Sequence, residues 1–115
     1  MNMQKPTASY WIEKLQLQKH IEGGSFREVY RSSLIIEKNN LPDIFNGSRN
    51  SSTSIYFLLE NGQFSALHRI ASDELWHFYY GDGLTIYQIN ALSGELHIKK
   101  LGSNIENGEV FNIAS

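Results

Sequence analysis

Residues 62–83, GQFSALHRIASDELWHFYYGDG, combine alternating hydrophobic positions, glycine turns and residue types suited to chemistry. Residues 64–70 and 74–80 alternate in character with period two, so each is predicted to be a strand. Pairing of these two strands as a hairpin would bring His68 close to Glu74 across the intervening turn. On the second strand, one predicted face carries Glu74, Trp76, Phe78 and Tyr80.

The chain from Gly24 to residue 114 shows the same pattern of strands and turns. Short runs rich in Val, Ile, Phe, Tyr and Thr are separated by Gly, Asn, Ser and Asp. No helical segment separates them, so a mostly β fold is predicted, an antiparallel sandwich or barrel. The polar residues 46–52 are predicted to form a surface loop. The runs are 25–31, 34–37, 53–59, 64–70, 74–80, 84–90, 95–101 and 110–113.

A short amphipathic helix is predicted ahead of the β region, over residues 8–18 approximately. Hydrophobic residues three or four positions apart share one side of a helix. Either Thr7 or Ser9 is predicted to cap its start, because both are good N-cap residues, and Pro6 is well placed just before it. The hydrophobic side consists of Ala8, Trp11, Ile12 and Leu15.

Composition limits the classes of function. The 115 residues are predicted to form a single domain, residues 1–115, with a net charge of −2. This slightly acidic balance argues against nucleic acid or an anionic membrane as partner. With no cysteine, disulfides and thiolate metal sites are excluded. The polar N-terminus does not resemble a secretory signal, and no apolar run suits a membrane span, so a cytoplasmic protein is expected.

His68 and Glu74 allow three interpretations. An imidazole nitrogen and a carboxylate oxygen suit a divalent metal such as Zn, Ni, Fe or Mn. Without a metal, the same two groups can work as a general acid/base pair. A polar pair that only satisfies its own hydrogen bonds is the third interpretation. The sequence requires no cofactor.

The spacing Gly62-x5-His68-x-Ile70-x3-Glu74-x6-Gly81 resembles the first conserved motif of the cupins, G-x5-H-x-H-x3,4-E-x6-G. Residues 15–32 (LQLQKHIEGGSFREVYRS) and 52–89 look like the family called cupin 5. The resemblance runs from about residue 11 to residue 108. It implies a double-stranded β-helix, the cupin jelly roll, with a small-molecule pocket in its mouth. Related jelly rolls include dTDP-sugar epimerases, which bind a nucleotide-sugar in that pocket.

The chain departs from the family in two places. Ile70 replaces the second histidine of the motif, so His68 and Glu74 remain as metal ligands with His77 as a tentative third. Alternation turns His77 away from Glu74 unless a bulge intervenes. The resemblance also implies that the C-terminal part of the family domain is missing and the jelly roll incomplete. A homodimer, common among cupins, would then cover unpaired sheet edges.

Further candidates lie around these residues. The block at residues 20–24, HIEGG, matches the family's HPEGG with Ile21 in place of proline. Its glycines are predicted to form a tight turn with positive φ, and a backbone-lined anion contact is the alternative. Glu28 and Tyr30 resemble family residues and are candidates for ligand binding, on a predicted face shared with Phe26. The aromatic candidates serve either as core or as a stacking platform for a ligand; they are Trp76, Phe78 and Tyr80.

Together these observations predict a protein that binds a small polar ligand, sugar-like or a nucleotide-sugar. An isomerase or epimerase would use His68 as general base, with Glu74 orienting it. The alternatives are a metal-dependent cupin enzyme and a non-catalytic ligand-binding or assembly module. Whether the protein is an enzyme stays open, because one scaffold carries many chemistries.

Overall fold

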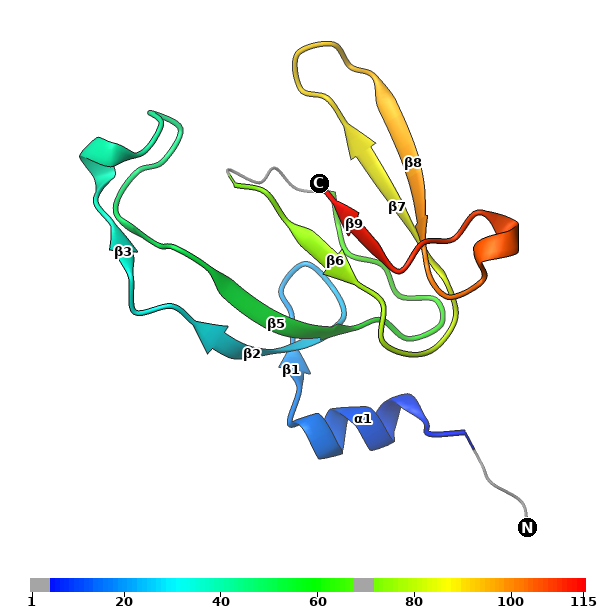
Figure 1. Cartoon of the computed structure of the whole chain (residues 1–115). Coiled ribbons are helices and arrows are strands. Elements are labelled where there is room, and N and C mark those ends of the chain that lie inside the picture. Colours follow the sequence, from blue (N-terminus) through cyan, green and yellow to red (C-terminus); the bar gives the residue numbers. More distant parts are fainter. Residues whose placement is uncertain (1–4, 68–71) are drawn as a thin grey trace. The chain divides into compact units, whose positions relative to one another are not determined.

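The computed structural model describes residues 5–67 and 72–115, which form two compact units (Figure 1). Residues 5–67 belong to the first unit and residues 72–115 to the second. Within the described ranges, no helix is both long and apolar enough to cross a bilayer. The two units are described separately below.

The first unit begins with the helix α1 (Ala8–Leu15). Thr7 caps it, since its Oγ1 accepts a hydrogen bond of 3.2 Å from the backbone N–H of Tyr10. The helix ends earlier than predicted because Gln16 adopts the left-handed conformation, with φ of 55°. The predicted hydrophobic side is confirmed, because its four residues are half-buried and the other helix residues are exposed.

Three antiparallel strands follow the helix in the order β1-β2-β5. They are β1 (Gln18–Lys19), β2 (Ser25–Arg31) and β5 (Thr53–Leu58). The predicted bounds of β2 are confirmed, and β5 ends one residue before its predicted end. The β region begins earlier than predicted, because β1 precedes the glycine turn.

The segment between β2 and β5 contains a small second sheet. β3 (Ile35–Ile36) and β4 (Arg49–Asn50) pair antiparallel, and a 3-10 helix, Lys38–Asn40, lies between them in the chain. The prediction of a surface loop at residues 46–52 is therefore wrong only at β4, which forms a strand. Arg49 and Asn50 form a strand because they pair with β3. The polar sequence around them contains no pattern that predicts this pairing.

The HIEGG block forms the turn that joins β1 to β2. The backbone N–H of His20 donates to the carbonyl of Gly24 at 2.9 Å, and Gly23 donates to His20 at 3.1 Å. Gly23 and Gly24 have φ of 111° and 78°, so the predicted positive-φ turn is confirmed. A Cβ on Gly23 would collide with the carbonyl oxygen of Phe64.

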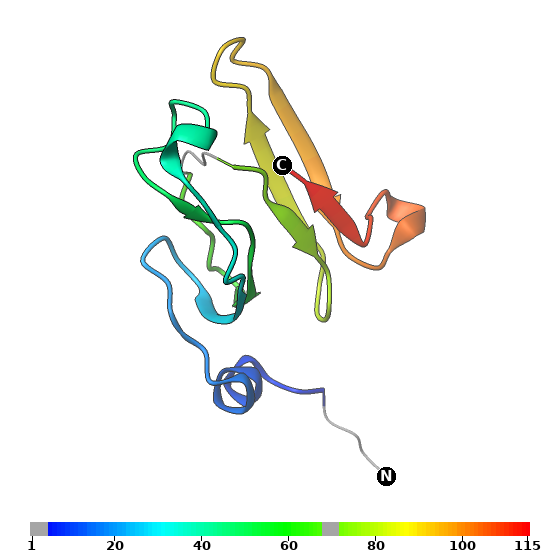
Figure 2. The ribbon, with the colours of Figure 1, turned by 60° about the vertical axis from the view of Figure 1, so that its left-hand side comes forward.

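The second unit consists of two antiparallel strand pairs, β6–β9 and β7–β8 (Figure 2). A 3-10 helix, Ile105–Asn107, lies between β8 and β9 in the chain. The backbone N–H of Val110 donates to Lys100 at 2.9 Å and thereby ties the segment before β9 to β8. The strands are β6 (Leu75–His77), β7 (Leu84–Ile89), β8 (Leu96–Leu101) and β9 (Asn112–Ala114).

The predicted strand at residues 64–70 is absent from its described part, and the pairing of residues 68–70 in the predicted hairpin lies outside the described residues. Residues 64–67 adopt no strand, and His68 and Ile70 lie outside the described residues. β6 pairs with β9, from the far end of the sequence. The predicted alternation within residues 74–78 is nevertheless correct, because alternation depends on the pleat and not on which strand is the partner.

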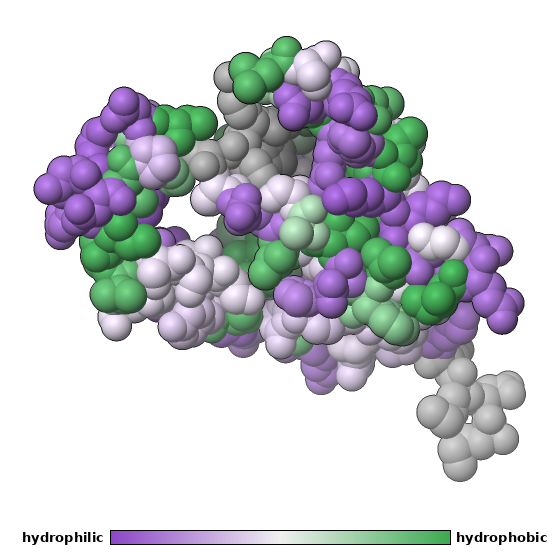
Figure 3. Space-filling model, turned by 45° about the horizontal axis from the view of Figure 1, so that its top comes forward, coloured by the Kyte–Doolittle hydropathy of each residue, from purple (hydrophilic) through white to green (hydrophobic). Residues whose placement is uncertain are grey.

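The mostly β prediction with one α-helix is confirmed for the described residues. Their strands form separate small sheets and no closed barrel. Few of the described hydrophobic side chains are buried: Phe45 in the first unit, and Leu101 and Ile113 in the second. Many hydrophobic side chains reach the surface, as the face drawn in Figure 3 shows.

Replacing Gly23 by Ala is expected to destabilise the protein by about 2–3 kcal/mol, because the new Cβ meets a backbone oxygen at positive φ. The change in unfolding free energy is measured by urea denaturation.

Gly47→Ala is the matched control. A Cβ at Gly47 meets no atom within 4 Å, and its φ is not positive. Its effect is expected to stay within about 0.5 kcal/mol. Equal effects of the two substitutions would show that the Gly23 turn is not tightly packed.

Candidate functional site

Glu74, Trp76 and Phe78 lie on one face of β6, as predicted. The ladder with β9 pairs Trp76 with Ile113, and backbone hydrogen bonds extend it at both ends. Glu74 exchanges two of these bonds with Ser115, at 2.9 and 2.8 Å. All three predicted residues are half-buried. The face therefore combines one carboxylate with two aromatic rings.

Tyr80 lies beyond the end of the paired strand, so it does not belong to this face. The hydrogen bonds to β9 end at Phe78, whose N–H donates to the carbonyl of Phe111 at 2.9 Å. Tyr80 follows in the bend that leads to β7 and is exposed. The alternation of side chains that places Glu74 and Trp76 on one face therefore does not determine where the side chain of Tyr80 points.

His77 lies on the opposite face of β6 from Glu74. It is exposed, and its partner on β9 is Asn112. The register has no bulge here, so the condition under which His77 joins Glu74 on one metal is not met.

A metal site is therefore not assembled by the described residues. They contain no cluster of three His, Asp or Glu side chains, whereas a catalytic zinc usually has three protein ligands. His68, the other predicted ligand and base, lies outside the described residues. The pairing of His68 with Glu74, with or without a metal, stays a prediction.

Glu28 forms an ion pair with Arg31 on β2. Arg31 donates to Glu28 through Nη2 at 2.5 Å and through Nε at 3.2 Å, and its Nη1 donates to Asn50 Oδ1 at 2.6 Å. The hydrogen bonds and negative charge of Glu28 raise the pKa of Arg31 above its ordinary value. An arginine guanidinium is always charged in a protein, and the two hydrogen bonds of Arg31 orient the Glu28 carboxylate.

A β-bulge at Val29 makes this ion pair possible. Glu28 pairs with Ile55, but Tyr30 pairs with the adjacent Ser54, so Val29 has no partner in the register. Because neighbouring residues on β5 point to opposite sides, Glu28 and Tyr30 lie on opposite faces. The predicted common face of these two residues is wrong, since the extra residue reverses the alternation and brings Arg31 beside Glu28.

His20 is a candidate that sequence reasoning missed. Its Nδ1 accepts a hydrogen bond of 2.9 Å from the backbone N–H of Glu22, so the neutral ring carries its proton on Nε2. Two aromatic rings contact the imidazole edge-on, Phe26 at 5.0 Å and Phe57 at 5.6 Å between centroids. The sequence feature that could have identified His20 is its position as the first residue of the HIEGG block.

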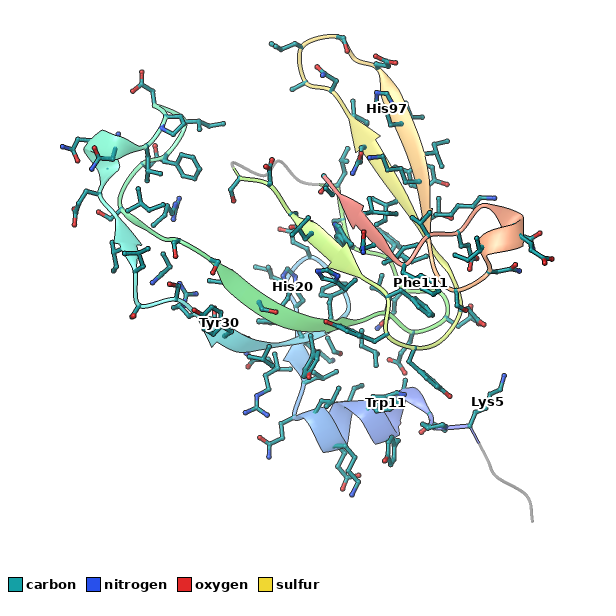
Figure 4. All side chains as sticks on the ribbon, viewed as in Figure 1. Lys5, Trp11, His20, Tyr30, His97 and Phe111 are labelled. Carbon is teal, nitrogen blue, oxygen red and sulfur yellow. The ribbon has the colours of Figure 1, made fainter. Side chains whose placement is uncertain are left out.

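His20 and Glu28 belong to the same face of the first sheet. Phe26, which contacts His20, stands two residues before Glu28 and therefore on the same side of β2. Figure 4 shows His20 near β2 and Tyr30 further along that strand. We call this surface the His20–Glu28 face; it consists of His20, Phe26, Glu28, Arg31, Ile55 and Phe57.

A groove of about 360 Å³ adjoins His20 in the first unit. Its polar lining includes Lys19, Glu60 and Gln63, and Ile12 and Leu17 form part of its apolar lining. This volume lies in the range of small-molecule sites. Among the described residues, the predicted catalytic, metal and ligand-binding residues do not line this groove, but His20, Gly23 and Gly24 of the HIEGG block do.

Comparison with known proteins gives the family. Residues 9–114 match the family model Cupin_5, described as cupin superfamily (DUF985). A crystal structure of a Shewanella oneidensis protein is 36% identical with a TM-score of 0.83, and a hypothetical protein from Leishmania major is 31% identical with the same TM-score. No curated protein matches the chain.

The chain covers less than two thirds of the length of these relatives. The two alignments include 96% and 95% of this chain but 64% of each relative. The expected cupin-like β fold is supported by the family model and by both structures. The chain belongs to the cupin superfamily, in the family Cupin_5 (DUF985).

Proposed function

We propose that the protein binds a small polar ligand, sugar-like or a nucleotide-sugar, and that the His20–Glu28 face contributes to the site. The observation that carries the proposal is the fixed set of polar groups on that face. His20 offers a donor at Nε2, and Glu28 offers carboxylate oxygens whose position Arg31 fixes.

The surroundings of these groups suit a ligand of mixed polarity. The rings of Phe26 and Phe57 and the exposed side chain of Ile55 lie on the same face. Small-molecule sites combine such an apolar lining with a few oriented polar groups. A sugar presents hydroxyl groups beside apolar C–H surface, which matches this combination.

The proposal extends to catalysis as an isomerase or epimerase. His68, oriented by Glu74, would take a carbon-bound proton next to a carbonyl group of the substrate, and the electron pair of that C–H bond would pass into an enolate. A proton from solvent added to the opposite face of the same carbon would then complete the epimerisation. A homodimer and a cytoplasmic location also belong to the proposal. The non-catalytic alternative is a protein that binds the same ligand without turning it over.

The first prediction concerns binding. Sugar nucleotides, tested beside organic acids and divalent metals, are expected to raise the thermal midpoint, because a ligand bound only by the native state stabilises it. Glu28→Gln is expected to weaken binding about 10- to 100-fold, as measured by calorimetry, through loss of a charged hydrogen-bond acceptor.

Glu13→Gln controls for the change in net charge, because Glu13 is exposed on α1 and belongs to a different surface. It is expected to bind as the wild type does. Equal loss in both variants, or a panel without any effect, would contradict the binding proposal.

The second prediction concerns proton transfer. With a keto-sugar nucleotide in D2O, the wild type is expected to incorporate deuterium at the carbon beside the carbonyl, detected by NMR. His68→Ala is expected to lower that rate at least about 100-fold, as for a general base.

His97→Ala serves as the control, since His97 is exposed on β8, where its Nε2 lies 3.6 Å from Glu95. It is expected to exchange at the wild-type rate. Ligand binding without any exchange would support the non-catalytic alternative.

The third prediction concerns metals. The purified protein is expected to contain no stoichiometric divalent metal, because Glu74 and His77 face opposite sides of β6. Elemental analysis by mass spectrometry measures this. One bound metal per chain that disappears in His68→Ala would contradict the metal-free proposal and support the metal-dependent enzyme.

A further inference from the structure

Three asparagines in this chain are followed directly by glycine, at Asn46-Gly47, Asn61-Gly62 and Asn107-Gly108. Asparagine is a thermolabile residue, because the backbone nitrogen of the next residue can attack its side-chain amide. Glycine in the next position favours this attack, since it has no Cβ to crowd the approaching atoms. All three pairs belong to the described residues, and their local structures differ.

The first pair lies in an open bend shortly before β4. Asn46 is exposed, and it follows the buried Phe45. The backbone N–H of Gly47 has no hydrogen-bond acceptor among the residues that the structure describes. A Cβ on Gly47 would meet no atom within 4 Å. The attacking nitrogen is therefore available at this pair, and the space beside it is open.

Two hydrogen bonds close the turn that contains the second pair. The N–H of Gln63 donates to the carbonyl of Glu60 at 2.9 Å, and the N–H of Glu60 donates to Oε1 of Gln63 at 2.9 Å. Asn61 and Gly62 are the central residues of this turn, and Gly62 has φ of 85°. Attack on the Asn61 side chain rotates the peptide unit between them, so it requires this turn to open.

In the third pair, the attacking nitrogen is itself hydrogen-bonded. The N–H of Gly108 donates to the carbonyl of Ile105 at 3.0 Å, where the 3-10 helix ends. The N–H of Asn107 donates to the carbonyl of Asn104 at 3.1 Å in the same turn. Attack by the Gly108 nitrogen therefore requires loss of a hydrogen bond that ends this helix.

We propose that Asn46 is the site at which the folded protein deamidates. The backbone nitrogen of Gly47, having lost its proton to solvent, forms a bond to Cγ of Asn46. The side-chain nitrogen takes up protons from water and leaves as ammonia, so that a cyclic succinimide remains. Water then opens the ring at either carbonyl carbon and gives aspartate or isoaspartate. The whole sequence consumes water, releases ammonia and involves no oxidation or reduction.

The product changes both the charge and the main chain of a packed segment. A carboxylate replaces a neutral amide, which makes a chain of net charge −2 more negative. Isoaspartate also lengthens the main chain by a methylene group directly after Phe45. The guanidinium of Arg49 in β4 lies over the Phe45 ring, at 5.7 Å from its centroid. The change thus falls on a segment whose side chains contact each other, and it is independent of the proposed ligand site.

Peptide mapping by mass spectrometry tests the order of the three sites. The native protein is incubated in mildly alkaline buffer made with heavy-oxygen water, which labels each new carboxylate. Asn46 is expected to react about 3- to 10-fold faster than Asn107, the effect of one net hydrogen bond on a rate. Asn61, held by two hydrogen bonds, is expected to react at least about tenfold more slowly than Asn46.

The same incubation in urea is the control for the fold. Unfolding removes the hydrogen bonds that protect Asn61 and Asn107, so the three rates are expected to converge. A native protein in which Asn46 is not the fastest site would overturn the proposal. An unchanged order of rates in urea would overturn the explanation by structure.

Ion-exchange chromatography gives an independent measurement of the added negative charge. The wild type is expected to form an acidic species that increases with time. Gly47→Ala is expected to lose this species, because the new Cβ crowds the attacking nitrogen while the fold is retained. Circular dichroism verifies folding. An acidic species that forms equally fast in Gly47→Ala would overturn Asn46 as the site.

Discussion

The antiparallel pairing of β2 with β5 is the constraint on which the candidate site depends. The two strands are joined by main-chain hydrogen bonds, and their register decides which side chains share a face. One extra residue, Val29, reverses the alternation and brings Arg31 to the side of Glu28. The glycine turn at Gly23 and Gly24 leads the chain from β1 into β2 and places His20 over Phe26 and Phe57.

In the second unit, strand pairing has a different consequence. The β7–β8 hairpin has one face against β9 and leaves a hydrophobic face in solvent. With so few buried hydrophobic side chains, the described units gain little from a core of their own. Surface of this kind is usually covered by another part of a protein or by a partner.

Local sequence patterns predicted the helix and several strands well, because these elements depend on residues that are neighbours in the sequence. The hydrophobic side of α1, the bounds of β2 and the alternation from Glu74 to Phe78 follow from helical and strand periodicity. The pairing of β6 with β9 was not predicted, since the two strands lie far apart in the sequence. His20 was missed although it begins the HIEGG block, because its hydrogen bond to Glu22 and its contacts with Phe26 and Phe57 form only in the folded chain.

The sequence alone determined the family, the mostly β class, the positive-φ turn and the separation of Glu74 from His77 along one strand. These depend on residue type and on the two-residue period of a strand, which is fixed by covalent geometry. Only the tertiary structure decided that Glu28 and Arg31 share a face, that β6 pairs with β9 and that Tyr87 and Ile98 stand side by side in solvent. These depend on the register between strands far apart in the chain, and no local pattern encodes that register.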